Sequence, residues 1–242
     1  MVKPLLFGVL GGMGPLATLD LLQKIIAATP ANRDQDHLPV VSWNVPQIAD
    51  RQKALAGKGD SPLPQLLNGI KKLNQLEVSH IVIPCNTAHH WYDSLAEASQ
   101  APILHIVDET VAQILLTYPY PQKIGLIATH GTLAAGWYQQ KIRAADIEVI
   151  FPTEEEMDKL FVAGCYAVKQ GEMALAGDLL EKLAALLVKR GAEKLLLACT
   201  EVPLALAAHH SSFLEISIDP TEMLAKACVK LWLEEGHGTP RY

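Results

Sequence analysis

The chain has 242 residues, of which 50% are hydrophobic and 19% charged, and this composition excludes a disordered or fibrous protein. Its formal net charge of -6, without a cluster of Lys and Arg, argues against a nucleic-acid partner, because phosphate binding needs a basic surface. Four widely spaced cysteines do not form a disulfide framework, and no apolar run approaches the ~20 residues of a membrane span. We therefore expect a soluble, cytoplasmic protein with no membrane partner.

Short apolar segments of strand length alternate with longer segments of helical periodicity along the whole chain. In the first half the predicted strands are 5–10, 39–43, 80–83 and 103–106, and the predicted helices are 15–28, 62–76 and 89–99. In the second half the predicted strands are 123–128, 148–150, 194–198 and 214–218, and the predicted helices are 134–144, 154–169, 174–189 and 202–208. Such alternation predicts parallel sheets covered by helices.

The second half of the chain repeats the first. Cys85 and Cys199 are 114 residues apart, and Gly8 and Gly125, at equivalent points of the first strand in each half, are 117 apart. The fold class predicted is therefore α/β, with two pseudo-symmetric lobes that each contain a four-stranded parallel sheet flanked by helices. The active site is expected in the cleft between the lobes.

The expected lobes are residues 1–116 and 117–220, and the final helix, 221–235, is expected to pack back on the first lobe. The linker is predicted near 116–122, where the run Tyr118-Pro119-Tyr120-Pro121 interrupts the helical pattern.

Two of the four cysteines occupy positions that favour chemistry. Cys85 and Cys199 each follow a predicted strand and precede a predicted helix, where open α/β sheets place ligand-binding loops and where a helix N-terminus favours a thiolate. Cys165 and Cys228 lie in helical segments and are predicted to be small hydrophobic core residues. Two opposed thiols suit the removal of a proton from one face of a carbon and its return to the other face.

A carbanion at Cα needs hydrogen-bond donors where its charge develops, on the α-carboxylate. Asn86, Thr87 and Thr200, with nearby backbone N–H groups, are the candidate donors. The glycine-rich turn at 11–14 lacks the third glycine of a dinucleotide fingerprint, so we expect its backbone to approach a substrate carboxylate instead.

A metal site is not expected. The pairs His89-His90 and His209-His210 lack the spacing of zinc ligands, and zinc would occupy the thiolates that are needed as bases.

Three motifs together resemble the aspartate/glutamate racemases, and specifically their aspartate racemase branch. They are Gly11-Gly12-Met13-Gly14-Pro15, Pro84-Cys85-Asn86-Thr87-Ala88-His89 and Cys199-Thr200-Glu201. The resemblance implies an amino-acid racemase with two α/β lobes, no pyridoxal phosphate or other cofactor, a homodimer, and the two cysteines as paired acid and base. Pro84 and Glu201 depart from the glutamate branch, and the presence of both cysteines favours two-base racemisation.

The resemblance also implies which residues bind the small amino-acid substrate. Its carboxylates are expected at Arg51, in the loop after the second strand, and at Lys159 in the second lobe, although a solvated lysine is the ordinary finding in a helix. Glu201 is either a first-turn acid that favours the helix dipole, or a group that relays protons or binds the amine. The full set expected to bind substrate is Gly12, Met13, Asn86, Thr87, Thr200, Glu201, Arg51 and Lys159.

Several other functions remain open at this point. The racemase could prefer glutamate or accept many amino acids, and related folds isomerise a dicarboxylate such as maleate or racemise hydantoins. A non-catalytic amino-acid-binding protein is the alternative from another class.

Overall fold

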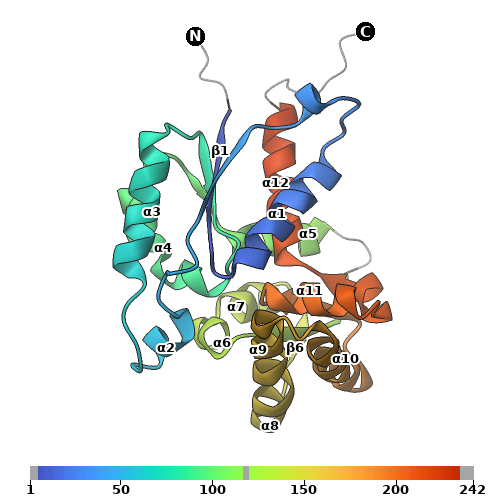
Figure 1. Cartoon of the computed structure of the whole chain (residues 1–242). Helices are drawn as coiled ribbons and strands as arrows, with labels where there is room; N and C mark the ends of the chain where they lie inside the picture. Colours follow the sequence, from blue (N-terminus) through green and yellow to red (C-terminus); the bar gives the residue numbers. More distant parts are fainter. Residues whose placement is uncertain (1–4, 117–119, 235–242) are drawn as a thin grey trace. The chain divides into compact units, whose positions relative to one another are not determined.

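The computed structural model describes residues 5–116 and 120–234. Contacts divide the chain into two compact units (Figure 1). The second unit is the continuous stretch Thr110–Pro220, and the first combines the chain up to Glu109 with the chain from Thr221 onward. The division falls within helix α5 (Ile106–Leu116) rather than at the predicted boundary of 116/117. Thr117, Tyr118 and Pro119 of the predicted linker lie outside the described residues.

The first unit is built on a four-stranded parallel sheet in the order β2-β1-β3-β4. Its central strand β1 is wholly buried, because its apolar residues have a strand on each side and helices on both faces. The strands are β1 (Phe7–Gly11), β2 (Val40–Asn44), β3 (His80–Val82) and β4 (Ile103–Leu104).

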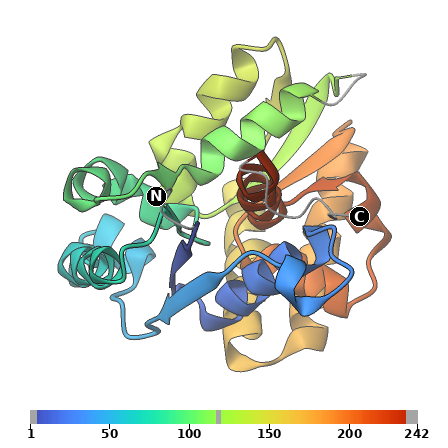
Figure 2. The ribbon, with the colours of Figure 1, turned by 90° about the horizontal axis from the view of Figure 1, so that it is seen from above.

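Helices cover both faces of this sheet. Those that lie in the first unit are α1 (Pro15–Ala28), α2 (Arg51–Leu55), α3 (Leu63–Gln75), α4 (Tyr92–Ala98) and α12 (Pro220–Glu234). Both views place α3 and α4 on one side of β1 and α1 and α12 on the other (Figure 2). The C-terminal helix is also fastened by a hydrogen bond from Trp232 Nε1 to the carbonyl of Asp36, at 3.2 Å. Glu235, the last residue of the predicted helix, lies outside the described residues.

The second unit repeats the plan, with a parallel sheet in the order β6-β5-β7-β8. Its strands are β5 (Lys123–Ala128), β6 (Glu148–Ile150), β7 (Lys194–Ala198) and β8 (Ser217–Ile218). Its helices are α6 (His130–Ala135), α7 (Trp137–Arg143), α8 (Glu154–Glu156), α9 (Ala163–Gln170), α10 (Met173–Lys189) and α11 (Glu201–Ala208). The matching strand orders confirm the predicted pair of four-stranded α/β lobes.

Three predicted elements of the second unit differ from the structure. The predicted helix 134–144 is divided into α6 and α7 by Gly136, whose φ of 75° is left-handed. The predicted helix 154–169 contains a π-helical turn, Met157–Val162, between α8 and α9. Most of the predicted strand 214–218 is a 3-10 helix, Ser212–Ile216.

Two helices were not predicted. α5 follows directly on β4 without a turn signal, so its first residue was included in the predicted strand 103–106. α2 begins after Asp50, whose carboxylate accepts hydrogen bonds from the backbone of Gln52 and Lys53 as a helix N-cap. No helix within the described residues is long and apolar enough to cross a membrane.

Candidate active site

Cys85 lies three residues beyond the end of β3 and is only 6% exposed. Its backbone N–H donates to the carbonyl of Ile83 at 2.8 Å. The element that follows is a 3-10 helix, Thr87–Trp91, and the α-helix α4 begins only at Tyr92. The sequence prediction of an α-helix that starts next to Cys85 is therefore wrong, and the helix dipole cannot be used to argue for a thiolate there.

His89 holds the Cys85 loop. Its ring is 1% exposed; Nδ1 lies 2.9 Å from the carbonyl of Cys85, and Nε2 accepts a hydrogen bond from the backbone N–H of Ile106 at 3.2 Å. Because that N–H can only donate, Nε2 carries no proton, and Nδ1–H donates to Cys85. Burial, followed by the neighbouring His105, lowers the pKa of His89 to about 3. A neutral imidazole therefore ties the Cys85 loop to the start of α5.

The pKa of His89 predicts a loss of stability in mild acid. An unfolded histidine binds a proton below pH ~6.5, whereas His89 in the folded chain stays neutral down to a pH of about 3, so protons favour the unfolded state in this interval. Between pH 6.5 and 5 this single group should lower the free energy of unfolding by about 2 kcal/mol. Urea unfolding at the two pH values measures the effect.

The matched variants are His89→Gln and His90→Gln. A glutamine at 89 can make both hydrogen bonds but does not titrate, and His90 is the exposed neighbour on the same 3-10 helix. We expect the first variant to lose clearly less stability on acidification than the wild type, and the second to follow the wild type. Equal losses in all three proteins would rule out His89 as the source.

Asn86 and Thr87 are both buried in the loop after Cys85. The hydroxyl of Thr87 accepts a hydrogen bond from Gln52 Nε2, on α2, at 3.0 Å. Sequence reasoning missed Gln52, and the N-cap signal of Asp50, which marks the start of α2, could have drawn attention to it.

Arg51 is the first residue of α2 and is half-buried. Its Nη1 donates to the carbonyls of Ile48 and Ala49, at 3.2 and 3.1 Å. The loop before α2 therefore orients the guanidinium, while the adjacent Gln52 joins the same helix to Thr87. The structure brings the predicted Arg51 onto the helix that contacts the Cys85 loop.

The glycine turn after β1 has a packing reason for its sequence. Gly12 has a φ of 100°, and a Cβ there would lie 2.3 Å from the carbonyl oxygen of Val45. The Gly12 N–H donates to Thr18 Oγ1 at 2.9 Å. Met13, which was expected to bind substrate, is buried in the same hydrophobic cluster as Cys85. The turn thus packs tightly against the loop that follows β2.

Cys199 directly follows β7 and is the centre of a polar cluster in the second unit. Its thiol donates to Glu201 Oε2 at 3.1 Å, and the hydroxyl of Thr200 donates to the same oxygen at 3.2 Å. The other oxygen of Glu201 lies 3.9 Å from the ammonium of Lys169. The buried carboxylate of Glu201 therefore contacts a thiol, a hydroxyl and an ammonium group.

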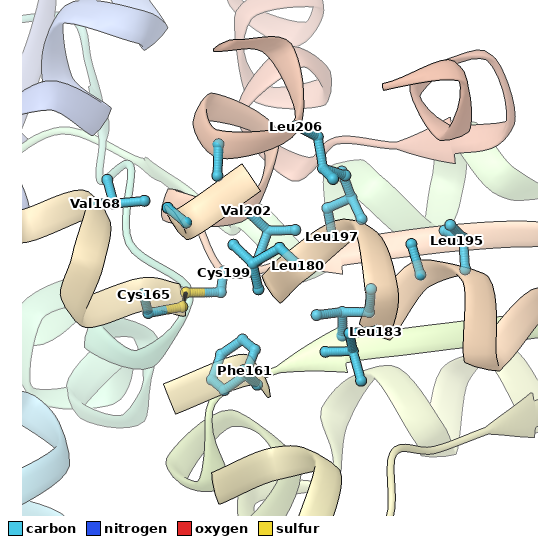
Figure 3. Close-up of a cluster of buried hydrophobic side chains, with 14 of the residues drawn as sticks. Phe161, Cys165, Val168, Leu180, Leu183, Leu195, Leu197, Cys199, Val202 and Leu206 are labelled. Carbon is cyan, nitrogen blue, oxygen red and sulfur yellow. Dashed lines mark hydrogen bonds between the residues drawn. The ribbon is translucent and has the colours of Figure 1, made fainter. Parts of the chain in front are cut away.

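Cys165 contacts Cys199 from the other side. Its sulfur, on α9, lies 3.7 Å from the Cys199 sulfur, and Figure 3 shows the two side chains pointing toward each other in the hydrophobic cluster that includes Phe161. The hydrogen bond with Cys165, then burial, and then the charges of Cys165 and Glu201 raise the pKa of Cys199 well above its usual value. Cys199 therefore rests as a thiol, although it stands before α11, where the sequence predicted a favoured thiolate.

The lysine beside Glu201 is Lys169, which the sequence analysis did not single out. Lys159 belongs to the π-helical turn, and its ammonium pairs with Glu155 at 2.7 Å, with both side chains exposed. Lys169 follows Cys165 by four residues on α9, and this spacing puts the two on one helix face. That spacing, taken together with a role for Cys165, could have identified Lys169.

Among residues 5–116 and 120–234, no group of three or more His, Cys, Asp or Glu side chains is arranged to hold a metal ion.

Residues 10–228 match the family model described as Asp/Glu/Hydantoin racemase. The chain belongs to this family. As a member of the Asp/Glu/hydantoin racemases, it is 30% identical to the broad specificity amino-acid racemase RacX of Bacillus subtilis (strain 168), over 94% of this chain and 98% of RacX. The resemblance to racemases found in the sequence motifs is thereby confirmed.

Solved structures of racemases share the fold. An aspartate racemase from Picrophilus torridus is 28% identical, with a TM-score of 0.83 and coverage of 97% of this chain and 100% of that one. A putative Asp/Glu racemase from Yersinia pestis is 25% identical, with a TM-score of 0.70 and coverage of 95% and 99%. The names of these similar racemases differ in substrate range. Membership of the family therefore does not identify the preferred amino acid, which stays a prediction.

Proposed function

We propose that the protein racemises a small amino acid, with aspartate the expected substrate, by a two-base mechanism that uses Cys85 and Cys199. The observation that carries the proposal is the equivalence of the two thiols. Cys85 follows β3 and Cys199 follows β7, which occupy the same place in two sheets of identical strand order. A racemase needs one acid–base group for each face of Cα, and a duplicated unit supplies the same group twice.

The proposed cycle starts with one thiolate and one thiol. Cys199 as the thiolate removes the Cα proton of the L-amino acid, and the thiol of Cys85 donates a proton to the opposite face. The charge that develops on the α-carboxylate would be stabilised by hydrogen bonds from Asn86 and Thr87, and from Thr200 when its hydroxyl turns from Glu201 to the substrate. The D-amino acid reacts with the roles reversed.

Glu201 explains how a thiol with a raised pKa could become a base. Its carboxylate already accepts the Cys199 S–H at 3.1 Å, so the proton has an acceptor within hydrogen-bond distance. Thr200 and Lys169 stabilise the negative charge of the carboxylate between turnovers. Of the two roles that the sequence left open, we assign to Glu201 that of proton acceptor for Cys199.

Arg51 and Lys169 are proposed as the cations for the two carboxylates of the substrate, and Lys169 replaces Lys159 in this role. Arg51→Lys keeps the charge but loses the planar fork that binds a carboxylate through two hydrogen bonds. We expect KM for aspartate to rise about tenfold, equivalent to ~1.4 kcal/mol of binding, with a smaller change in kcat.

Steady-state kinetics with L- and D-aspartate measure this effect. The control is Arg33→Lys, which changes an exposed arginine of the same unit whose Nε pairs with Asp36. An unchanged KM in Arg51→Lys would remove Arg51 from the substrate site.

A broad-specificity racemase is the second candidate, favoured by the 30% identity with RacX over nearly the whole chain. Glutamate racemisation, dicarboxylate isomerisation, hydantoin racemisation and amino-acid binding without catalysis are the remaining possibilities. These possibilities differ in which compound, if any, exchanges a carbon-bound proton with the solvent.

Solvent deuterium incorporation tests the proposal. The protein is incubated in deuterated water, without added cofactor, with L-aspartate, L-glutamate, several neutral L-amino acids, maleate and a hydantoin, and products are resolved by chiral chromatography and mass spectrometry. We expect deuterated D-aspartate to form fastest. Equal rates across the neutral amino acids would favour the second candidate, and saturable binding with no exchange would contradict catalysis. Sedimentation of the same sample checks the expected homodimer.

A further inference from the structure

Cys165 has no part in the proposed mechanism, yet it makes the closest sulfur contact to Cys199. The two sulfurs approach to 3.7 Å from separate elements, α9 and the end of β7 (Figure 3). The S–S bond of a disulfide is about 2.05 Å long. Rotations of the two side chains therefore have to shorten the distance between the sulfurs from 3.7 Å to this bond length.

The surroundings of the pair are apolar on one side and polar on the other. Phe161, Leu180 and Val202 belong to the same buried cluster as both cysteines, while the carboxylate of Glu201 lies within hydrogen-bond distance of Cys199. Only 8% of Cys165 and 6% of Cys199 is exposed, so we expect only a very small reagent to reach the two sulfurs. Both thiols are reduced in the structure.

We infer that Cys165 and Cys199 form a peroxide-sensitive dithiol, in which a reversible Cys165–Cys199 disulfide switches the enzyme off. Disulfides that form in reducing compartments are usually transient and serve redox sensing. The loss of activity rests on the proposed function, because it assumes that Cys199 is an acid–base group. The formation of the disulfide itself does not.

The chemistry needs only a peroxide as oxidant. The Cys199 thiolate, formed by proton transfer to Glu201, attacks one peroxide oxygen; the O–O bond breaks, and the second oxygen leaves as hydroxide and becomes water. The resulting sulfenic acid is attacked by the sulfur of Cys165, which gives up its proton; the S–S bond forms, the S–O bond breaks, and a second water leaves. Two thiols and one hydrogen peroxide thus give one disulfide and two waters.

The disulfide would remove both states of Cys199 that racemisation uses, the thiol and the thiolate. It would also break the Cys199–Glu201 hydrogen bond. Because the pKa of Cys199 is raised, only a small fraction of it is thiolate near neutral pH. Oxidation should therefore be slow near neutral pH and faster as the pH rises.

The test uses the full chain, reduced and then exposed to hydrogen peroxide. Remaining thiols are alkylated, the protein is digested without reduction, and linked peptides are found by mass spectrometry while racemisation is assayed in parallel. We expect a linked peptide that joins Cys165 to Cys199, a fall in activity of about 100-fold or more, as for loss of a general acid–base group, and recovery with dithiothreitol.

Two variants separate this pair from general oxidation, each compared with its own untreated activity. Cys165→Ala should give no linked peptide, and long peroxide treatment should carry its Cys199 to the sulfinic acid, which dithiothreitol does not reduce. Cys228→Ala, at a buried cysteine of the first unit, should link and recover like the wild type.

Three results would overturn the inference. They are the absence of a Cys165–Cys199 peptide in wild-type protein that peroxide has inactivated, linkage to a different cysteine, and full recovery of Cys165→Ala with dithiothreitol after the same long peroxide treatment. The first two need no variant to fold. A linked peptide in a protein that shows no racemisation before treatment would support the dithiol and contradict the proposed function.

Discussion

Replacing either Cys85 or Cys199 by serine is expected to reduce racemisation by about 10²- to 10⁴-fold in both directions, the range that a general acid–base group contributes. A serine hydroxyl is nearly isosteric with the thiol but far less acidic, so it neither forms the anion that removes the Cα proton nor replaces that proton readily. Chiral chromatography of product from L- and from D-aspartate gives kcat/KM for each direction.

Proton exchange without inversion distinguishes the two bases. In deuterated water, Cys85→Ser should still exchange the Cα proton of the L-isomer slowly through Cys199, and Cys199→Ser should do the same for the D-isomer through Cys85. Cys228→Ala, at a buried cysteine of α12, serves as the control and should racemise like the wild type. Full racemisation by either serine variant would contradict the two-base mechanism.

Glu201→Gln is expected to lower kcat by about 10²-fold, the low end for a group that transfers protons. The amide preserves the shape of the side chain but can no longer accept the proton of Cys199. The charge of the native carboxylate, which raises the pKa of Cys199, also disappears, whereas the amide oxygen can still accept the S–H hydrogen bond. The pKa of Cys199 should therefore fall in the variant, although kcat falls too.

These opposite changes can be measured separately. The rate of alkylation of Cys199 by iodoacetamide, followed by peptide mass spectrometry across a pH series, reports its pKa, and steady-state assays report kcat. Glu215→Gln, at an exposed position of the 3-10 helix Ser212–Ile216, is the matched control and should change neither. A Cys199 pKa that stays unchanged in Glu201→Gln would show that the carboxylate does not act on the thiol.

The elements that sequence reasoning placed well are those with unambiguous local signals. The strands β5, β6 and β7 have the predicted bounds, because each is a short apolar run between turn signals. α1 also has the predicted bounds, since Pro15 starts it immediately after the glycine turn. The positions of Cys85 and Cys199 beyond strand ends followed from the same signals.

Contacts made by tertiary packing were not accessible in this way. Cys165 and Cys199 are 34 residues apart in sequence, and only the packing of α9 in the core brings them together. That packing is close: a Cβ on Gly164 would lie 2.8 Å from Leu180 Cγ on α10. A sequence with one isolated cysteine in a helix carries no sign of such a neighbour.

The position of Lys169 beside Glu201 was not accessible from the sequence for a more specific reason. The sequence predicts one continuous helix over 154–169, whereas the π-helical turn Met157–Val162 adds a residue to one turn. An added residue rotates everything after it by about 100° relative to a regular α-helix. The helix face of Lys159 therefore does not determine the helix face of Lys169.

The discontinuous first unit has a consequence for biosynthesis. Its sheet is synthesised before residue 110, but α12, which covers one face of β1 and donates from Trp232 to Asp36, is synthesised only after the whole second unit. Because the N-terminus emerges from the ribosome first, the continuous second unit can complete its fold before the first unit does. The unit whose sheet is made first therefore waits for α12 before its core is closed, and nascent chains halted before residue 220 should expose apolar sheet surface to chaperones.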